Sequence, residues 1–97
     1  MKTDIRAIHF AIKQPLEDFI NKKLEKLSRR YPDAEEAEVV LKVEKPETHE
    51  NKDVAVTVKV PGAAPLYSSK TADSFEEAFD ACLASIEPGL ERLKERK

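Results

Sequence analysis

The chain is poor in the residues that build most catalytic and metal sites. Among its 97 residues, one is cysteine, two are glycine and two are histidine. A lone Cys82 cannot form an internal disulfide, which agrees with a reducing compartment, and Gly62 and Gly89 are too far apart for a Gly-rich phosphate loop. His9 and His49 lack partners at metal-ligand spacing. We therefore expect no metal, no cofactor, no small-molecule substrate and no enzymatic activity.

Long apolar runs are also missing. No segment approaches the roughly 18 apolar residues that cross a bilayer, and residues 1–10 lack the continuous hydrophobic stretch of a signal peptide. These features predict a cytoplasmic protein without a membrane partner. A composition of 37% charged and 40% hydrophobic residues is typical of a soluble globular protein, and the length suits one domain over residues 1–97.

The first half of the chain has the pattern of a strand, a helix and a strand. Residues 2–10 are extended in character, and Gln14-Pro15 marks a helix start, since proline at the first helical position loses no hydrogen bond. Pro32 disfavours helix in the residue before it, so the helix ends near Tyr31. From residue 37 to 43, apolar and polar residues alternate, which predicts a strand with one buried face.

The second half has the pattern of a hairpin and a helix. Alternation resumes over residues 54–60, and Pro61-Gly62 then predicts a tight turn, followed by a hairpin partner from about Leu66 to Ala72. Asp73 and Ser74 are both suitable N-caps for the next helix, each with a glutamate three residues later.

The last helix carries apolar residues at spacings of three and four from Phe75 to Leu93. Pro88 interrupts it and costs about 3 kcal/mol within an unbroken helix. We expect a kink or short interruption there, with the last turns still packed on the core. The alternative is a helix that ends near Ile86 and a frayed tail.

The order is therefore β-α-β-β-β-α. Strands with one apolar face need a cover, and two amphipathic helices can supply it from one side. The predicted fold class is α+β, a two-layer sandwich of a four-stranded sheet with both helices on one face. The other face of the sheet should be exposed and polar; its expected residues are Glu38, Lys42, Glu44, Thr57 and Lys59.

The one surface pattern that suggests a partner is a basic stripe on the first helix. At about 100° per residue, the positive side chains fall on one side of the helix and the acidic ones on another. The residues of this basic stripe are Lys22, Lys26, Arg29 and Arg30, with Lys23 flanking them. Residues 13–30 carry six basic and three acidic side chains, a local charge of +3 in a chain of net charge −2.

An ordinary solvated helix would also explain this stripe. Asp18 with Lys22, and Glu25 with Arg29, are i,i+4 pairs that stabilise an exposed helix by a few tenths of a kcal/mol each. The stripe alone does not decide between that interpretation and a phosphate-binding face.

Three sequence segments, taken together with the element order, resemble those of a known protein family. They are Leu16–Leu27 (LEDFINKKLEKL), Val39–Lys45 (VVLKVEK) and Ser74–Asp80 (SFEEAFD). Together they resemble ribosome hibernation-promoting factors, also called ribosomal subunit interface or sigma-modulation proteins, clearly from residue 2 to about 80. The resemblance implies a domain like the double-stranded-RNA-binding domain, with two roughly parallel helices.

The function that this resemblance implies is non-enzymatic. Such a factor binds the small ribosomal subunit in the channel of messenger and transfer RNA and stops translation in starved or stationary cells. It presents basic helix residues to rRNA phosphates, and the matching positions here are Lys22, Lys23, Lys26, Arg29 and Arg30. We expect a short form of the family, without the extra C-terminal domain that longer members use to dimerise ribosomes, and so no ribosome dimerisation by that route. Its own oligomeric state stays open, with a monomer favoured.

The second helix departs from the family pattern. Residues 73–97 carry seven acidic and four basic side chains, and the positions where family members have basic or polar residues are here Ser85, Pro88, Gly89 and Glu91. Arg92 and Arg96 are the only matching cations there. An alternative is therefore a divergent relative that has lost ribosome binding and acts as a protein-interaction module, through its acidic second helix or exposed sheet.

Overall fold

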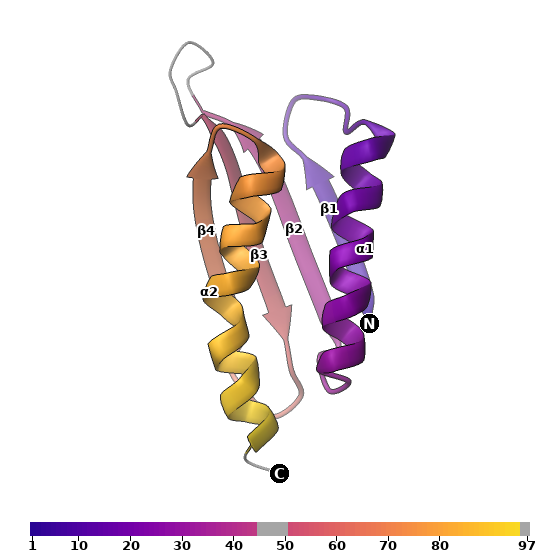
Figure 1. Cartoon of the computed structure of the whole chain (residues 1–97), viewed down its shortest axis with the longest axis vertical. Coiled ribbons are helices and arrows are strands. Elements are labelled where there is room, and N and C mark those ends of the chain that lie inside the picture. The colour runs from indigo at the N-terminus through magenta and orange to yellow at the C-terminus, as the bar shows by residue number, and fades with distance from the viewer. Residues whose placement is uncertain (45–50, 96–97) are drawn as a thin grey trace.

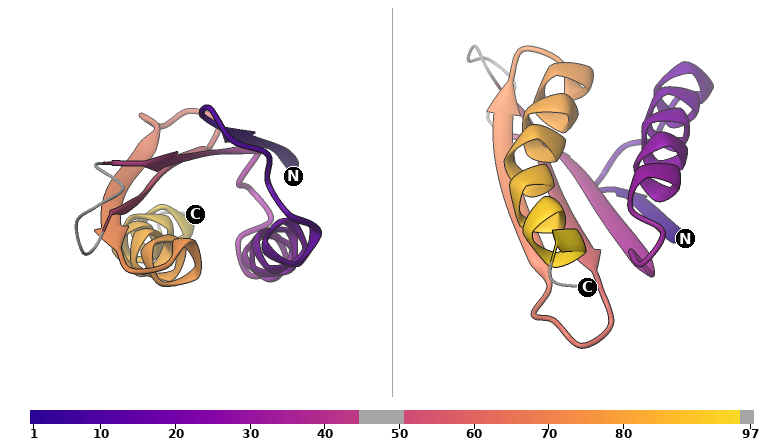
Figure 2. Two further views of the ribbon diagram at one scale, coloured as in Figure 1. Left: turned by 90° about the horizontal axis from the view of Figure 1, so that it is seen from above. Right: turned by 60° about the horizontal axis from the view of Figure 1, so that its bottom comes forward.

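The computed structural model describes residues 1–44 and 51–95 and has the predicted element order (Figure 1). Its elements are β1 (Lys2–Ala7), α1 (Gln14–Arg30), β2 (Glu36–Val43), β3 (Lys52–Lys59), β4 (Leu66–Ala72) and α2 (Phe75–Glu95). The sheet has the order β1-β2-β3-β4; β1 is parallel to β2, and the other neighbours are antiparallel. Both helices lie on one face of the sheet, as seen from above in Figure 2. The predicted two-layer α+β sandwich is confirmed.

Strand alternation places one set of side chains beneath the helices. In the middle of β2 and β3, three alternate residues of each strand are fully buried, and the register sets Val39 opposite both Ile5 and Val56. The buried apolar side chains are Ile20, Leu24, Leu27, Tyr31, Ala34, Ala37, Val39, Leu41, Val54, Val56, Val58, Ala78, Phe79, Cys82, Leu83, Ile86 and Leu90. The core therefore lies between the sheet and the apolar faces of α1 and α2, where both helical periodicities predict it.

Local capping fixes the ends of both helices. The N–H of Tyr31 donates to the Leu27 carbonyl (2.8 Å), so α1 closes its last turn just before Pro32. At the start of α2, the Ser74 hydroxyl accepts a hydrogen bond from the N–H of Glu77 (3.1 Å). Of the two predicted N-cap candidates, Asp73 and Ser74, it is therefore Ser74 that caps α2.

The predicted Pro61-Gly62 turn joins β3 to β4. The N–H of Ala63 donates to the carbonyl of Val60 (3.2 Å) across the turn, and Gly62 has a φ of 80°. A side chain at that φ is disfavoured, so glycine at the second central position determines the turn type.

Pro88 does not interrupt α2. The helix runs unbroken through it from Phe75 to Glu95, so a short interruption and the alternative of an end near Ile86 are both wrong, whereas a kink at Pro88 stays a prediction. The expected packing of the last turns on the core is confirmed by the burial of Leu90. Ile86 and Leu90 are 3% and 2% exposed, and burial on either side of the proline offsets its local cost. A Cβ on Gly89 would lie 2.9 Å from Leu66 Cδ2, so this glycine lets α2 lie close against β4.

Replacing this proline should stabilise the protein. Pro88 is exposed and cannot donate to the Ala84 carbonyl, so Pro88→Ala restores a helix hydrogen bond and removes a steric conflict. We expect a gain of about 1–3 kcal/mol in the free energy of unfolding, reduced from the full helix penalty because proline also stiffens the unfolded chain. Urea denaturation measures it. Ser85→Ala, at another exposed α2 position, is the control; equal stability of the two variants would contradict the prediction.

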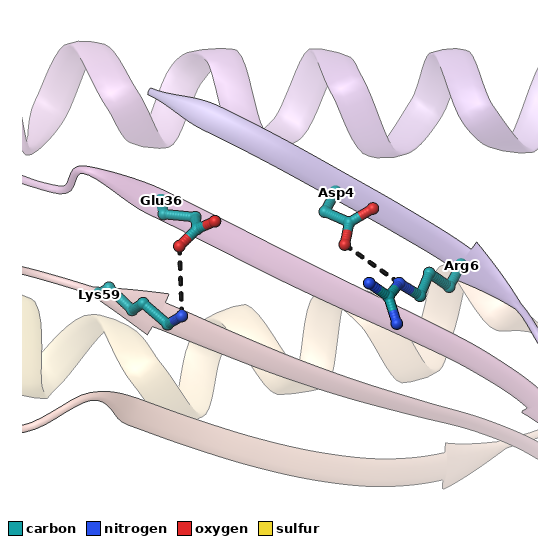
Figure 3. Close-up of polar contacts among 4 residues, drawn as sticks. All are labelled: Asp4, Arg6, Glu36 and Lys59. Carbon is teal, nitrogen blue, oxygen red and sulfur yellow. Dashed lines mark hydrogen bonds and ion pairs between the residues drawn. The ribbon is translucent and has the colours of Figure 1, made fainter.

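The outer face of the sheet is charged, as predicted, and its charges pair with one another (Figure 3). Arg6 Nε lies 3.1 Å from Asp4 Oδ2, and Lys59 Nζ lies 3.2 Å from Glu36 Oε2. The hydrogen bond to Glu36 raises the pKa of the Lys59 ammonium. Several charged side chains of this face are therefore paired with a neighbour of opposite charge.

Candidate nucleic-acid interface

The two helices run side by side in the same direction (Figures 1 and 2). A groove lies between their side chains. Lys23, Lys26, Leu27 and Arg30 of α1 line this interhelical groove, together with Asp80, Leu83, Ala84 and Glu87 of α2. Its volume is about 370 Å³. Buried Leu27 and Leu83 form part of its lining, and charged side chains from both helices stand at its sides.

Two of the three cations in the groove face a carboxylate of the other helix. Lys23 Nζ lies 3.4 Å from Asp80 Oδ1, and Arg30 Nη1 lies 3.8 Å from Glu87 Oε2. Lys26 is exposed and has no carboxylate partner within residues 1–44 and 51–95. Three cations and two carboxylates leave the groove with a formal charge of only +1.

The rest of the basic stripe lies outside the groove. Arg29 pairs with Glu25 of its own helix, as the i,i+4 spacing predicts. The predicted partner of Lys22 behaves differently: Asp18 accepts a hydrogen bond from Gln14 Nε2 (2.8 Å). Lys22 is left exposed and without an ion pair in the part of the chain that the structure describes. The stripe is thus divided between the groove and the outer side of α1.

Of the two cations predicted on the second helix, only Arg92 lies within the described residues, and it does not line the interhelical groove. Arg92 lines a different hollow of about 620 Å³, at the C-terminal end of α2 beside Tyr31, Pro61 and Lys94. Arg96 lies outside the described residues. The structure therefore brings together three of the seven predicted rRNA-binding residues in one groove, with Lys22 and Arg29 beside it.

The role of the acidic face of α2 is the feature that sequence reasoning missed. Helical rotation puts Asp80, Glu87 and Glu91 on one side of α2, and the structure turns that side toward α1. Asp80 and Glu87 are seven residues apart, as are their partners Lys23 and Arg30. Equal spacing on two parallel helices was the signal in the sequence that could have revealed these pairs.

A third contact from this acidic face joins the C-terminal half of α2 to the end of α1. The hydroxyl of Tyr31, a side chain that is 4% exposed, donates to Glu91 Oε2 at 2.7 Å. Burial, and then this hydrogen bond, raise the pKa of the Tyr31 phenol to about 12, although the Arg30 guanidinium acts in the opposite direction. The phenol therefore stays protonated and keeps its hydrogen bond well above neutral pH.

Cys82, which was considered as a nucleophile, occupies a structural position in the core. Cys82 is buried and its thiol lies 3.2 Å from the Val54 carbonyl oxygen, to which it donates. Burial raises the pKa of this thiol, so it is a poor nucleophile. His9 is exposed on the connection before α1, and His49 lies outside the described residues.

Residues 1–44 and 51–95 contain neither a metal-binding cluster nor a membrane-spanning helix. No three His, Cys, Asp or Glu side chains gather there as a metal site would require. Neither helix, over its described residues, is long and apolar enough to span a membrane.

Known proteins share both the sequence pattern and the fold. A protein of Pseudomonas putida named ribosome hibernation promoting factor is 26% identical over 97 residues, which cover all of this chain and 90% of that protein. A ribosomal subunit interface protein from Coxiella burnetii superposes with a TM-score of 0.83 at 19% identity, covering 98% of this chain and 99% of that one. The N-terminal domain of Thermus thermophilus Protein Y gives 0.79 at 23%, covering 96% and 99%. At these identities the two structures show a common fold.

The family assignment rests on a match along nearly the whole chain. The family described as Sigma 54 modulation protein / S30EA ribosomal protein matches residues 3–97. This range includes both helices, β2, β3, β4 and all of β1 except Lys2. The chain therefore belongs to the Sigma 54 modulation protein / S30EA ribosomal protein family.

Proposed function

We propose that this protein is a non-enzymatic ribosome-binding factor that occupies the decoding channel of the small subunit and inhibits translation in starved or stationary cells. Membership of the family supports ribosome binding, as does the relative named for promoting ribosome hibernation. In this proposal, rRNA and the small subunit are the partners, and the site of action is the cytoplasm.

The observation that carries the proposal is the exposed positive charge on α1. Lys22 and Lys26 are exposed, one turn apart, and lack carboxylate partners within the described residues. Lysine side chains in this state bind phosphates and release the cations condensed on nucleic acid, which supplies affinity without sequence preference. Structured RNA is recognised largely through its shape and backbone, and a rigid pair of parallel helices offers a surface for that recognition.

The protein-interaction alternative gains no specific support. Its two candidate surfaces are the outer sheet face, where Arg6 and Lys59 pair with neighbouring carboxylates, and the acidic side of α2. Three carboxylates of that acidic side, Asp80, Glu87 and Glu91, contact α1. Much of the charge that would attract a protein partner is therefore used within the molecule.

Sedimentation with purified small subunits tests ribosome binding. The protein should pellet with them at about 50 mM salt and dissociate strongly by about 200 mM, since phosphate contacts dominate the affinity. A protein that stays in the supernatant at the lower salt concentration does not bind the ribosome, and the proposal fails.

Two further readouts test where and how it acts. Messenger RNA and transfer RNA bound in advance should reduce binding, because they occupy the proposed channel, and a cell-free translation reaction should slow in proportion to occupancy. Large subunits alone are the control. Unchanged binding in the presence of both RNAs would place the site elsewhere, and full translation activity at saturating protein would contradict inhibition.

A further inference from the structure

The interhelical groove contains its own competitor for phosphate. Lys23 faces Asp80 and Arg30 faces Glu87, at 3.4 and 3.8 Å, across the line where the two helices approach. These carboxylates occupy positions next to the cations, where RNA phosphate oxygens would have to bind. Lys26 lies between the two pairs along α1 and has no such partner within residues 1–44 and 51–95.

Both ion pairs are open to exchange. The side chains of Lys23 and Asp80 are 39% and 50% exposed, and those of Arg30 and Glu87 are 62% and 38% exposed. Ion pairs with this much solvent contribute little to folding. The cations can therefore leave the carboxylates for an incoming phosphate without loss of the fold, because the core beneath them is apolar and buried.

We propose that Asp80 and Glu87 set the affinity of the groove for RNA by competing with phosphates for Lys23 and Arg30. This inference rests on the proposed ribosome binding. A phosphate first engages Lys26, and a second and third bind only as the carboxylates release their partners. The released carboxylates then stand close to the RNA backbone and repel it, so the groove binds more weakly than its cations alone would.

Salt dependence distinguishes this competition from a simple lack of charge. Each phosphate contact to a duplex contributes about −0.9 to the slope of log K against log salt. An exchanged cation contributes less, because the carboxylate that it leaves gathers a counterion of its own. Removing the carboxylates should therefore raise the affinity and make the slope steeper.

The test compares two variants of the full chain with equal change in net charge. Asp80→Asn with Glu87→Gln removes the competitors. Asp53→Asn with Glu38→Gln removes an aspartate and a glutamate from the outer face of the sheet. Binding to small subunits and to a short RNA duplex is measured at several salt concentrations.

The groove variant should bind about 2- to 30-fold more tightly than the parent, the range expected for two exposed ion pairs. Its salt slope should be steeper by about 1 to 2, whereas the sheet variant should resemble the parent. If both variants gain equally, net charge explains the effect and the inference is wrong.

Weaker binding by the groove variant would show that the carboxylates position the helices, which also overturns the inference. Glu87→Gln alone, at the longer ion pair, gives the same test with less risk to the fold, and circular dichroism verifies folding of each variant. Failure of the parent to bind small subunits would reject the proposed function. A parent that binds while the groove variant matches the sheet variant rejects the competition and leaves the function standing.

Discussion

Reversing the charge of Lys22 and Lys26 together, by Lys22→Glu with Lys26→Glu, should abolish ribosome binding while the protein stays folded. The two changes remove two phosphate contacts and place two negative charges near the RNA, so affinity should fall by about 100-fold or more. Both side chains are exposed and unpaired within the described residues. The thermal midpoint should therefore shift by less than about 4 °C. Sedimentation and thermal unfolding measure the two quantities.

The matched control reverses two cations elsewhere on the molecule. Lys2 and Arg6 are exposed on β1, and strand alternation turns them away from the helices. Lys2→Glu with Arg6→Glu changes the net charge equally and should retain most of the binding. Survival of binding in the α1 variant would show that the stripe is not the contact surface. Equal losses in both variants would indicate an effect of net charge.

Removing the ring of Phe79 should cost the most stability of any change considered. This side chain is fully buried in α2 and meets Phe19 of α1 edge to face, with ring centroids 6.3 Å apart. Phe79→Ala leaves a cavity where both helices meet the sheet, and such truncations cost about 3–5 kcal/mol. A domain of this size has about 5–15 kcal/mol in total. Urea denaturation should therefore show a large fall in the midpoint.

Phe79→Leu is the control for this prediction. It keeps an apolar side chain of similar size and should cost about 1 kcal/mol. A difference of less than about 1 kcal/mol between the alanine and leucine variants would show that the site collapses around the gap. The alanine variant should also lose ribosome binding at temperatures where it unfolds, which makes circular dichroism a necessary companion measurement.

Features that depend on the local geometry of one helix, strand or turn could be predicted from the sequence alone. Alternation over residues 37–43 identifies the buried face of β2, and Pro61-Gly62 identifies the turn, because both follow from local backbone geometry. The start of α1 at Gln14 follows from Pro15 in the same way. These features require no knowledge of where any other element lies.

Contacts between two elements could not be predicted from the sequence. A helical rotation gives the direction of Asp80 on its own helix, but the partner Lys23 depends on the rotation and offset of α1, which the packing of both helices on the sheet determines. Pro88 illustrates the same limit. Its local penalty predicts a kink or a short interruption, and burial of Ile86 and Leu90 on the core keeps the helix unbroken.

The seating of Tyr31 between the ends of the two helices gives the protein an intrinsic optical probe. The chain has no tryptophan and two tyrosines. Tyr67 is 65% exposed on β4, whereas Tyr31 is enclosed and bonded to Glu91. An immobilised ring in an asymmetric environment gives near-ultraviolet circular dichroism, and a freely rotating one gives little. The tyrosine bands in the near-ultraviolet spectrum of the unlabelled protein therefore report chiefly on the junction between α1 and α2.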